Sequence, residues 1–144
     1  MQQVKDPDKA VRYAEKAAEV LTTKAKPEGI SAGDWEKKKG ASLGLAYWMA
    51  GTTLAGQNKP AQADKNLRAA LPHIKDNAQL NGTALFYLGL MNYQMGKGKN
   101  PAQMAEAVGF MQQSAGIAGP FQAKASTNLA VMKREAPTAV PKKK

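Results

Sequence analysis

The sequence predicts an all-α protein of about six helices, and three observations support this prediction. Alanine and other strong helix formers are abundant, whereas aromatic residues make up only 6% of the 144 residues and β-branched residues are sparse, a composition that favours helices over strands. Apolar residues recur at spacings of three and four, the period of one helix face. Prolines and glycines separate the periodic segments, so that each has its own start or stop signal.

The first two predicted helices have clear start signals. Asp6 is placed to cap the first helix, with Pro7 at its first position, where a missing N–H costs nothing. The apolar residues of this helix recur on one face: Ala10, Ala14, Ala17 and Leu21. Pro27 then breaks the pattern, and Ser31 is placed to cap a second helix that reaches about Gln57.

Four further helices follow, each after a turn or a break in the pattern. Pro60 and Pro101 stand at the first positions of the third and fifth helices, and Pro72 is expected to kink or end the third. The fourth helix is predicted for residues 77–95 and the sixth for residues 120–134. The basic tail, residues 136–144, has two prolines, three lysines and no periodicity, so it is predicted to be disordered.

Two segments of the chain repeat each other. "NKPAQADKNL" and "KNPAQMAEAV" share "PAQ", and the helix before each segment has a central glycine, Gly51 in the first unit and Gly89 in the second. Glycine inside a helix costs about 1 kcal/mol relative to alanine, so we expect each glycine to lie where another helix approaches closely. The apolar residues of the following helices also match: Ala63, Leu67 and Ala70 correspond to Met104, Val108 and Met111.

This pattern resembles the tetratricopeptide repeat (TPR) family, whose first helix carries a large residue, then Leu-Gly, then an aromatic residue one turn later. Leu85, Leu88-Gly89 and Asn92-Tyr93 match that helix. The resemblance implies an α-solenoid of antiparallel helix pairs. Its parts would be a single domain of residues 1–135 with a partial repeat at 6–25, repeats at about 41–76 and 77–117, and a capping helix at 120–134.

The resemblance also implies which residues hold the repeats together. Small residues and the residues that face them pack between paired helices: Gly51, Ala63, Leu67, Ala70, Leu88 and Gly89. The first predicted helix resembles the second helix of a repeat whose first helix is missing. We therefore expect the chain to be part of a longer repeat protein, and we expect the apolar stripe of this helix to favour self-association.

Catalytic chemistry has little support in the sequence. His73 is the single histidine and the chain contains no cysteine, so neither a nucleophile–base pair nor a sulfur-ligated metal site is indicated. The acidic residues are scattered, and several lie at helix starts, where they complement the helix dipole. We therefore expect no enzymatic activity, no metal site and no cofactor.

A binding surface is the function that the resemblance implies. In TPR proteins the first helices of successive repeats line a concave groove that receives peptides. The corresponding residues here are Trp48, Thr52, Ala55, Thr83, Phe86, Leu90 and Tyr93, with Asn92 and Gln94 extending the polar edge. The sequence leaves open whether Trp48 and Phe86 face this groove or are covered by the neighbouring helix.

The net charge of +10 allows a second interpretation, a basic module that binds nucleic acid or an anionic surface. Its lysine clusters, residues 37–39 and 142–144, are not interleaved with the aromatic residues that specific nucleic-acid binding would use. The favoured prediction is a non-enzymatic protein–protein interaction module that binds a partner peptide or helix in the concave groove. A structural spacer within a larger repeat protein is the third interpretation.

The sequence gives no sign of membrane targeting. Residues 1–10 lack the apolar core of a signal peptide, and no apolar run approaches the length that spans a bilayer. We expect a soluble chain that does not insert into membranes. Neither its compartment nor the identity of its protein partner can be predicted from these residues.

Overall fold

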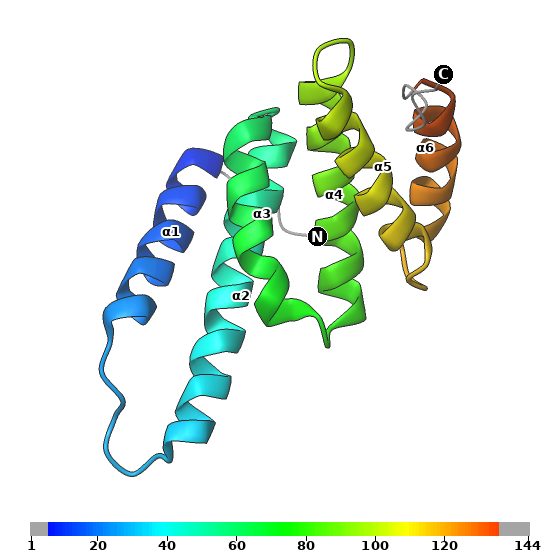
Figure 1. Cartoon of the computed structure of the whole chain (residues 1–144). Coiled ribbons are helices and arrows are strands. Elements are labelled where there is room, and N and C mark those ends of the chain that lie inside the picture. Colours follow the sequence, from blue (N-terminus) through cyan, green and yellow to red (C-terminus); the bar gives the residue numbers. More distant parts are fainter. Residues whose placement is uncertain (1–5, 136–144) are drawn as a thin grey trace.

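A computed structural model describes residues 6–135, and within this range the chain forms six α-helices and no β-strand (Figure 1). The helices are α1 (Pro7–Thr23), α2 (Ala32–Gly56), α3 (Pro60–Ile74), α4 (Ala78–Gly96), α5 (Pro101–Ala115) and α6 (Gln122–Glu135). The predicted all-α fold of about six helices is thereby confirmed. The tail that was predicted to be disordered, residues 136–144, lies outside the described residues.

Side-chain caps fix four of the helix starts. Asp6 Oδ1 and Ser31 Oγ each accept a hydrogen bond from the backbone N–H three residues later, both at 3.1 Å. Asn77 and Asn100 cap α4 and α5 in the same way, at 3.0 and 3.1 Å. Each cap satisfies one of the backbone donors that the first turn of a helix leaves unpaired.

Pro72 does not end α3 early, so of the two outcomes that the sequence suggested, a kink or an early stop, the early stop is wrong. The helix passes through Pro72 and ends at Ile74. Because Pro72 lies in the last turn, the backbone hydrogen bond that it removes is near the end of the helix rather than in its middle. This last turn still packs on α2, since an added Cβ on Gly44 would lie 2.7 Å from His73 Cβ.

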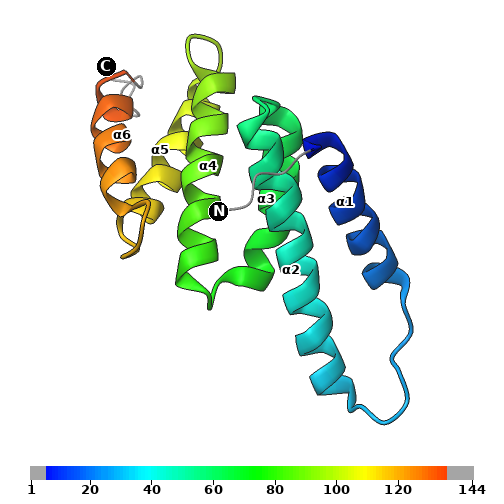
Figure 2. The ribbon, with the colours of Figure 1, turned by 180° about the vertical axis from the view of Figure 1, so that it is seen from behind.

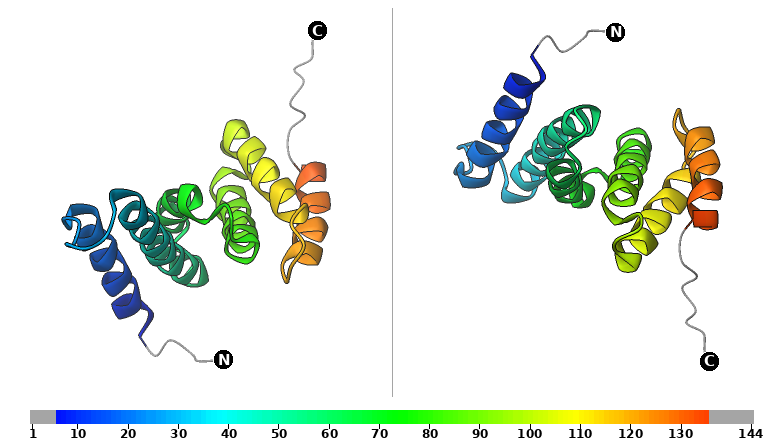
Figure 3. Two further views of the ribbon diagram at one scale, coloured as in Figure 1. Left: turned by 90° about the horizontal axis from the view of Figure 1, so that it is seen from below. Right: turned by 90° about the horizontal axis from the view of Figure 1, so that it is seen from above.

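The six helices stand side by side in chain order, with α1 at one end of the row and α6 at the other (Figures 1 and 3). α2 packs along α3, and α4 packs along α5. α3 also packs on α4, while α1 packs on α2 and α6 on α5. On the side seen in Figure 2, α2 and α6 each contact α4 as well. α4 is therefore the most enclosed helix of the row.

Small residues let the paired helices approach closely. An added Cβ on Gly51 would lie 2.5 Å from Leu67 Cγ, and one on Gly89 would lie 2.9 Å from Met111 Cε. Both distances are too short for an alanine side chain unless an atom moves. The other residues that the resemblance assigned to repeat packing are fully buried: Ala63, Leu67, Ala70 and Leu88. The two helix-centre glycines thus lie where a second helix approaches.

A polar cluster joins α3, α4 and α5, and the sequence did not predict it. Asn92 is 1% exposed, and its amide donates to Asp64 Oδ1 and to the backbone O of Leu88, both at 2.8 Å. Arg68 binds Asp64 and forms a bidentate ion pair with Glu106, at 2.8 and 2.9 Å. Hydrogen bonding to Glu106 raises the pKa of Arg68, and hydrogen bonding from Arg68 lowers the pKa of Glu106. Asn92 therefore belongs to the core and does not extend the polar edge of a groove.

Candidate functional site

Two of the predicted groove residues, Trp48 and Thr52, lie on α2 with their polar groups already paired. Trp48 Nε1 donates to the backbone O of Leu80 on α4 at 3.0 Å. Thr52 Oγ1 donates to the backbone O of Trp48 at 2.9 Å. Both side chains are half-buried. Trp48 thus ties α2 to α4 and has no free N–H to offer to a ligand.

Three further predicted groove residues are buried, which corrects the prediction made from the sequence. Ala55 is 8% exposed, Thr83 7% and Phe86 5%. The Phe86 ring packs against Phe121, directly before α6, with ring centroids 4.8 Å apart, and against Tyr87 at 5.4 Å. Because the end of the row covers Phe86 and packing within the row covers the other two, these side chains do not line an open groove.

Leu90 and Tyr93, the last two predicted groove residues, are half-buried and pack with the residues around Phe86. The Tyr93 hydroxyl donates to the Glu135 carboxylate on α6, and Lys97 Nζ lies 3.2 Å from the same carboxylate. Hydrogen bonds from Tyr93 and Lys97 lower the pKa of Glu135, and the bonds of Lys97 with Tyr93 and Glu135 raise the pKa of Lys97. These contacts hold α6 against the end of α4.

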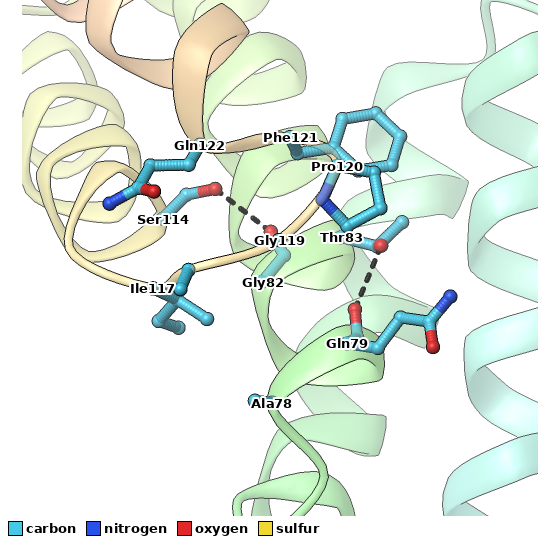
Figure 4. A pocket seen from close by; sticks show the side chains of 11 residues that line it. Ala78, Gln79, Gly82, Thr83, Ser114, Ile117, Gly119, Pro120, Phe121 and Gln122 are labelled. Carbon is cyan, nitrogen blue, oxygen red and sulfur yellow. Dashed lines mark hydrogen bonds between the residues drawn. The ribbon is translucent and has the colours of Figure 1, made fainter.

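A cavity beside Thr83 is too small for a ligand. It lies where the turn between α5 and α6 passes α4 (Figure 4), and its volume is about 10 Å³, at the lower limit for a single water molecule. Ser114 Oγ donates to the backbone O of Gly82, and Thr83 Oγ1 donates to the backbone O of Gln79, both at 2.9 Å. The hydroxyl groups at this cavity are therefore paired within the protein.

An open apolar groove lies at the opposite end of the row, between α1 and α2. Its volume is about 480 Å³. The α1 wall consists of Ala10, Tyr13, Ala14, Ala17 and Leu21. The α2 wall consists of Ser42, Leu45, Ala46 and Met49. We call this surface the α1/α2 groove.

Large hydrophobic side chains stand exposed along the α1/α2 groove. Among residues 6–135, the exposed ones are Tyr13 at 64%, Met49 at 48%, Val20 at 47% and Leu45 at 46%, and all but Val20 line the groove. At the other end of the row, the outward residues of α6 are mostly polar: Gln122, Lys124, Ser126, Thr127 and Lys133. Contiguous exposed apolar surface on a soluble protein usually marks an interaction site, so the α1/α2 groove is the candidate site.

The sequence predicted the apolar stripe that forms most of the α1 wall, without Tyr13, and it did not predict the α2 wall. The helix α1 is amphipathic: its apolar stripe lies on one face and charged residues lie on the opposite face. The second half of α2 is apolar on several faces, so periodicity cannot distinguish the face that meets another helix from the face that stays open. A signal for Met49 existed in the repeat: the 38-residue shift pairs Met49 with Tyr87, which packs in one cluster with Tyr47 and Trp48 of the preceding α2.

The described residues do not gather groups for metal binding. Within residues 6–135, no three His, Cys, Asp or Glu side chains come together in a way that could hold a metal ion. His73 is exposed near the end of α3. In the same range, none of the helices is both long enough and apolar enough to cross a membrane.

No protein-family model matches the chain, and neither a curated protein nor a solved structure matches it significantly. Its function is therefore inferred from its own residues and their geometry.

Proposed function

We propose that this protein is a non-enzymatic protein–protein interaction module, a TPR-like α-solenoid that docks a partner protein in the α1/α2 groove. The observation that carries the proposal is the exposure of Tyr13, Leu45 and Met49 along one groove. Fully burying a leucine or methionine side chain stabilises by about 1.5–3 kcal/mol relative to leaving it in water. A partner that covers these side chains gains that free energy.

Helix pairing and spacing support the TPR-like arrangement. α2 pairs with α3 and α4 pairs with α5, and each first helix places a glycine, Gly51 or Gly89, at the close contact. These glycines are 38 residues apart, while Pro60 and Pro101, which begin the second helices, are 41 residues apart. The difference is the three-residue insertion in the second turn. α2 and α4 also contact each other, as successive first helices of a solenoid would.

The proposed site differs from the concave groove that the family resemblance implies. Trp48 and Tyr93 use their polar groups to join helices, and Phe86 is covered by Phe121. A partner in the α1/α2 groove would instead extend the row of helices beyond its α1 end. The proposal therefore keeps the predicted function and moves its site.

Site-specific photo-crosslinking in cells that produce the protein tests this proposal. A photoreactive residue in place of Met49 should crosslink to a partner protein, because Met49 lines the groove. The same residue in place of Gln112, which is exposed on α5, should not. Absence of a protein crosslink at position 49, or equal crosslinking at both positions, would contradict the proposal.

The net charge of +10 supports a second candidate function, binding of nucleic acid or an anionic surface. Binding driven by phosphate contacts falls steeply between about 50 and 200 mM salt, whereas apolar docking does not. Binding of an RNA or DNA oligonucleotide that disappears at the higher salt and is unchanged by Met49→Ser would favour this candidate. Binding of a protein partner that persists at the higher salt and is weakened by Met49→Ser would favour the groove.

A further inference from the structure

We infer that the occupant of the α1/α2 groove is an amphipathic α-helix of a partner protein, with acidic residues flanking its apolar face. This inference rests on the proposed function, because it takes the groove to be a docking site. It goes further by assigning the shape, the side-chain size and the charge of what docks there. Each assignment follows from a different feature of the groove.

The α1 wall has the same register as a covered helix face elsewhere in the protein. α1 and α3 both begin with proline, and the residues 3, 7, 10 and 14 positions later share one face. In α3 these residues are Ala63, Leu67, Ala70 and Ile74, which are between 0 and 3% exposed. α2 approaches Leu67 and Ile74 at its glycines, and α4 packs on the same cluster. In α1 they are Ala10, Ala14, Ala17 and Leu21, of which only Ala14 is buried. α1 therefore presents a helix-packing face that lacks its helix.

The α2 wall corresponds to a covered face of α4 in the same way. Gly51 and Gly89 occupy matching positions 38 residues apart, which pairs Ser42 with Leu80 and Met49 with Tyr87. Leu80 and Tyr87 pack in one cluster with Trp48 of α2, whereas Ser42 and Met49 are exposed. The α1/α2 groove is thus the counterpart of the groove between α3 and α4, which α2 fills. An α-helix is the shape that fits it.

Side-chain size at the α1 wall predicts large apolar residues on the occupant. Where α3 carries Leu67, α2 places Gly51 against it. The matching residue of α1 is Ala14, which is much smaller, and Ala17 lies one turn further on. Well-packed interfaces alternate large and small facing residues. Leucine, isoleucine or methionine should therefore stand on the occupant where α2 has glycine.

Charges around the groove predict acidic flanks on the occupant. Lys9 lies at the α1 rim, with Nζ 5.6 Å from the centre of the Tyr13 ring, and the exposed Lys38 lies one turn before the α2 wall. Lys16, further along the α1 rim, pairs with Glu19 at 3.1 Å. A second copy of the chain would bring another charge of +10 to this surface. Long-range repulsion opposes that approach, whereas an acidic helix is attracted.

Three synthetic peptides of equal length provide the test with the whole chain. Two carry the same leucine stripe at spacings of three and four, one with glutamates and the other with lysines at the remaining positions. The third keeps the glutamates and replaces the leucines with serine. Fluorescence anisotropy of labelled peptides should give an affinity for the glutamate–leucine peptide at least about tenfold above that of either other peptide.

Matched variants locate the binding. Leu45→Ser and Met49→Ser should each weaken the glutamate–leucine peptide at least about tenfold, whereas Val20→Ser should not, because Val20 is 47% exposed outside the groove. Lys38→Glu should lower the preference for the acidic peptide, and Lys124→Glu at the far end of the row should leave it unchanged. Thermal melts check folding, which these exposed positions should not disturb.

Four results would overturn the inference. Equal binding of the two leucine peptides would show that the occupant needs no acidic flanks. If the serine peptide bound as tightly as the glutamate–leucine peptide, charge alone would account for the binding. If none of the three peptides bound, an amphipathic helix would not be the occupant. A dimer in analytical ultracentrifugation that Leu45→Ser dissociates would identify a second copy as the occupant. In each case a protein crosslink at position 49 would still support the proposed docking function, so the two failures remain distinguishable.

Discussion

At the residue scale, the two helix-centre glycines face different neighbours. An added Cβ on Gly51 would lie 2.5 Å from Leu67 Cγ and 3.1 Å from Leu67 N. The nearest atom to an added Cβ on Gly89 is the terminal methyl of Met111 at 2.9 Å, and the next atoms are at 3.3 Å. A methionine methyl can rotate away, whereas a leucine Cγ next to its own backbone cannot.

We therefore expect the two alanine substitutions to differ. Gly51→Ala should lower the free energy of unfolding by about 1–3 kcal/mol through overpacking. Gly89→Ala should change it by less than about 1 kcal/mol, because alanine gains about that much helix propensity over glycine. Urea denaturation of both variants measures the difference. Equal losses of stability would contradict the distinction between the two contacts.

Asn92 is the buried polar residue whose replacement should cost most in the cluster that joins α3, α4 and α5. Its amide donates to Asp64 and its carbonyl accepts a hydrogen bond from Gln103 Nε2 at 3.2 Å. Asn92→Ala leaves Asp64 and Gln103 without this hydrogen-bond partner in a part-buried site. The substitution should lower the free energy of unfolding by about 1–3 kcal/mol. Gln94→Ala, on the exposed side of the same helix, should stay within about 0.5 kcal/mol. Thermal and urea melts of the pair provide the comparison.

At the element scale, the Arg68–Glu106 ion pair links α3 to α5 and should make stability depend on pH. The guanidinium lowers the pKa of Glu106 below its ordinary value of 4.5. The pair therefore stabilises the fold above pH 4.5, and this contribution is lost as the pH falls through the lowered pKa. Both side chains are partly exposed, so the contribution should be about 1 kcal/mol or less.

The matched variant for this pair is Glu106→Gln. At neutral pH it should be less stable than the parent, and the difference should shrink to zero as the pH is lowered well below 4.5. Urea midpoints measured across this pH range test the expectation. A difference that stays constant down to the acid range would show that Glu106 acts through packing instead of charge.

Phe121 is the residue through which the end of the row covers α4. Its ring centroid lies 4.8 Å from that of Phe86 and 5.8 Å from that of Tyr87. Phe121→Ala should cost about 1–3 kcal/mol, less than the 3–5 kcal/mol of a fully buried phenylalanine, because Phe121 is half-buried. Lys133→Ala, at an exposed position of α6, is the control. An unchanged melting temperature for Phe121→Ala would mean that α6 is held mainly by its Tyr93 and Lys97 contacts.

The elements differ in how much of them could be predicted from the sequence. The helix starts at Asp6, Ser31 and Pro60 depend on neighbouring residues, so local patterns identified them. Whether Phe86 is covered depends on Phe121, 35 residues later in the chain, and no local pattern contains that information. Likewise Leu45 is apolar whether or not a helix lies on it. The predicted groove therefore failed where stacking of the helices decides exposure.

At the scale of the whole molecule, the helices should differ in their local stability. α4 packs on α2, α3, α5 and α6, whereas α1 packs on α2 and is joined to α3 by a hydrogen bond from Asn66 to Glu15. Opening α1 therefore exposes far less buried surface than opening α4. Hydrogen exchange measured by mass spectrometry should show the fastest exchange among the helices in α1 and the slowest in α4. Uniform protection across the row would contradict this gradient.

The two ends of the row differ in polarity, and this difference affects whether copies of the protein can polymerise. A head-to-tail contact between identical copies does not close on itself, and it grows into a filament when the two ends are complementary. Here the apolar α1/α2 groove of one copy would meet the polar residues of α6 of the next, such as Gln122, Lys124 and Thr127. Burying those groups against an apolar wall leaves them without hydrogen-bond partners, which is costly. The polar face of α6 therefore disfavours open-ended growth.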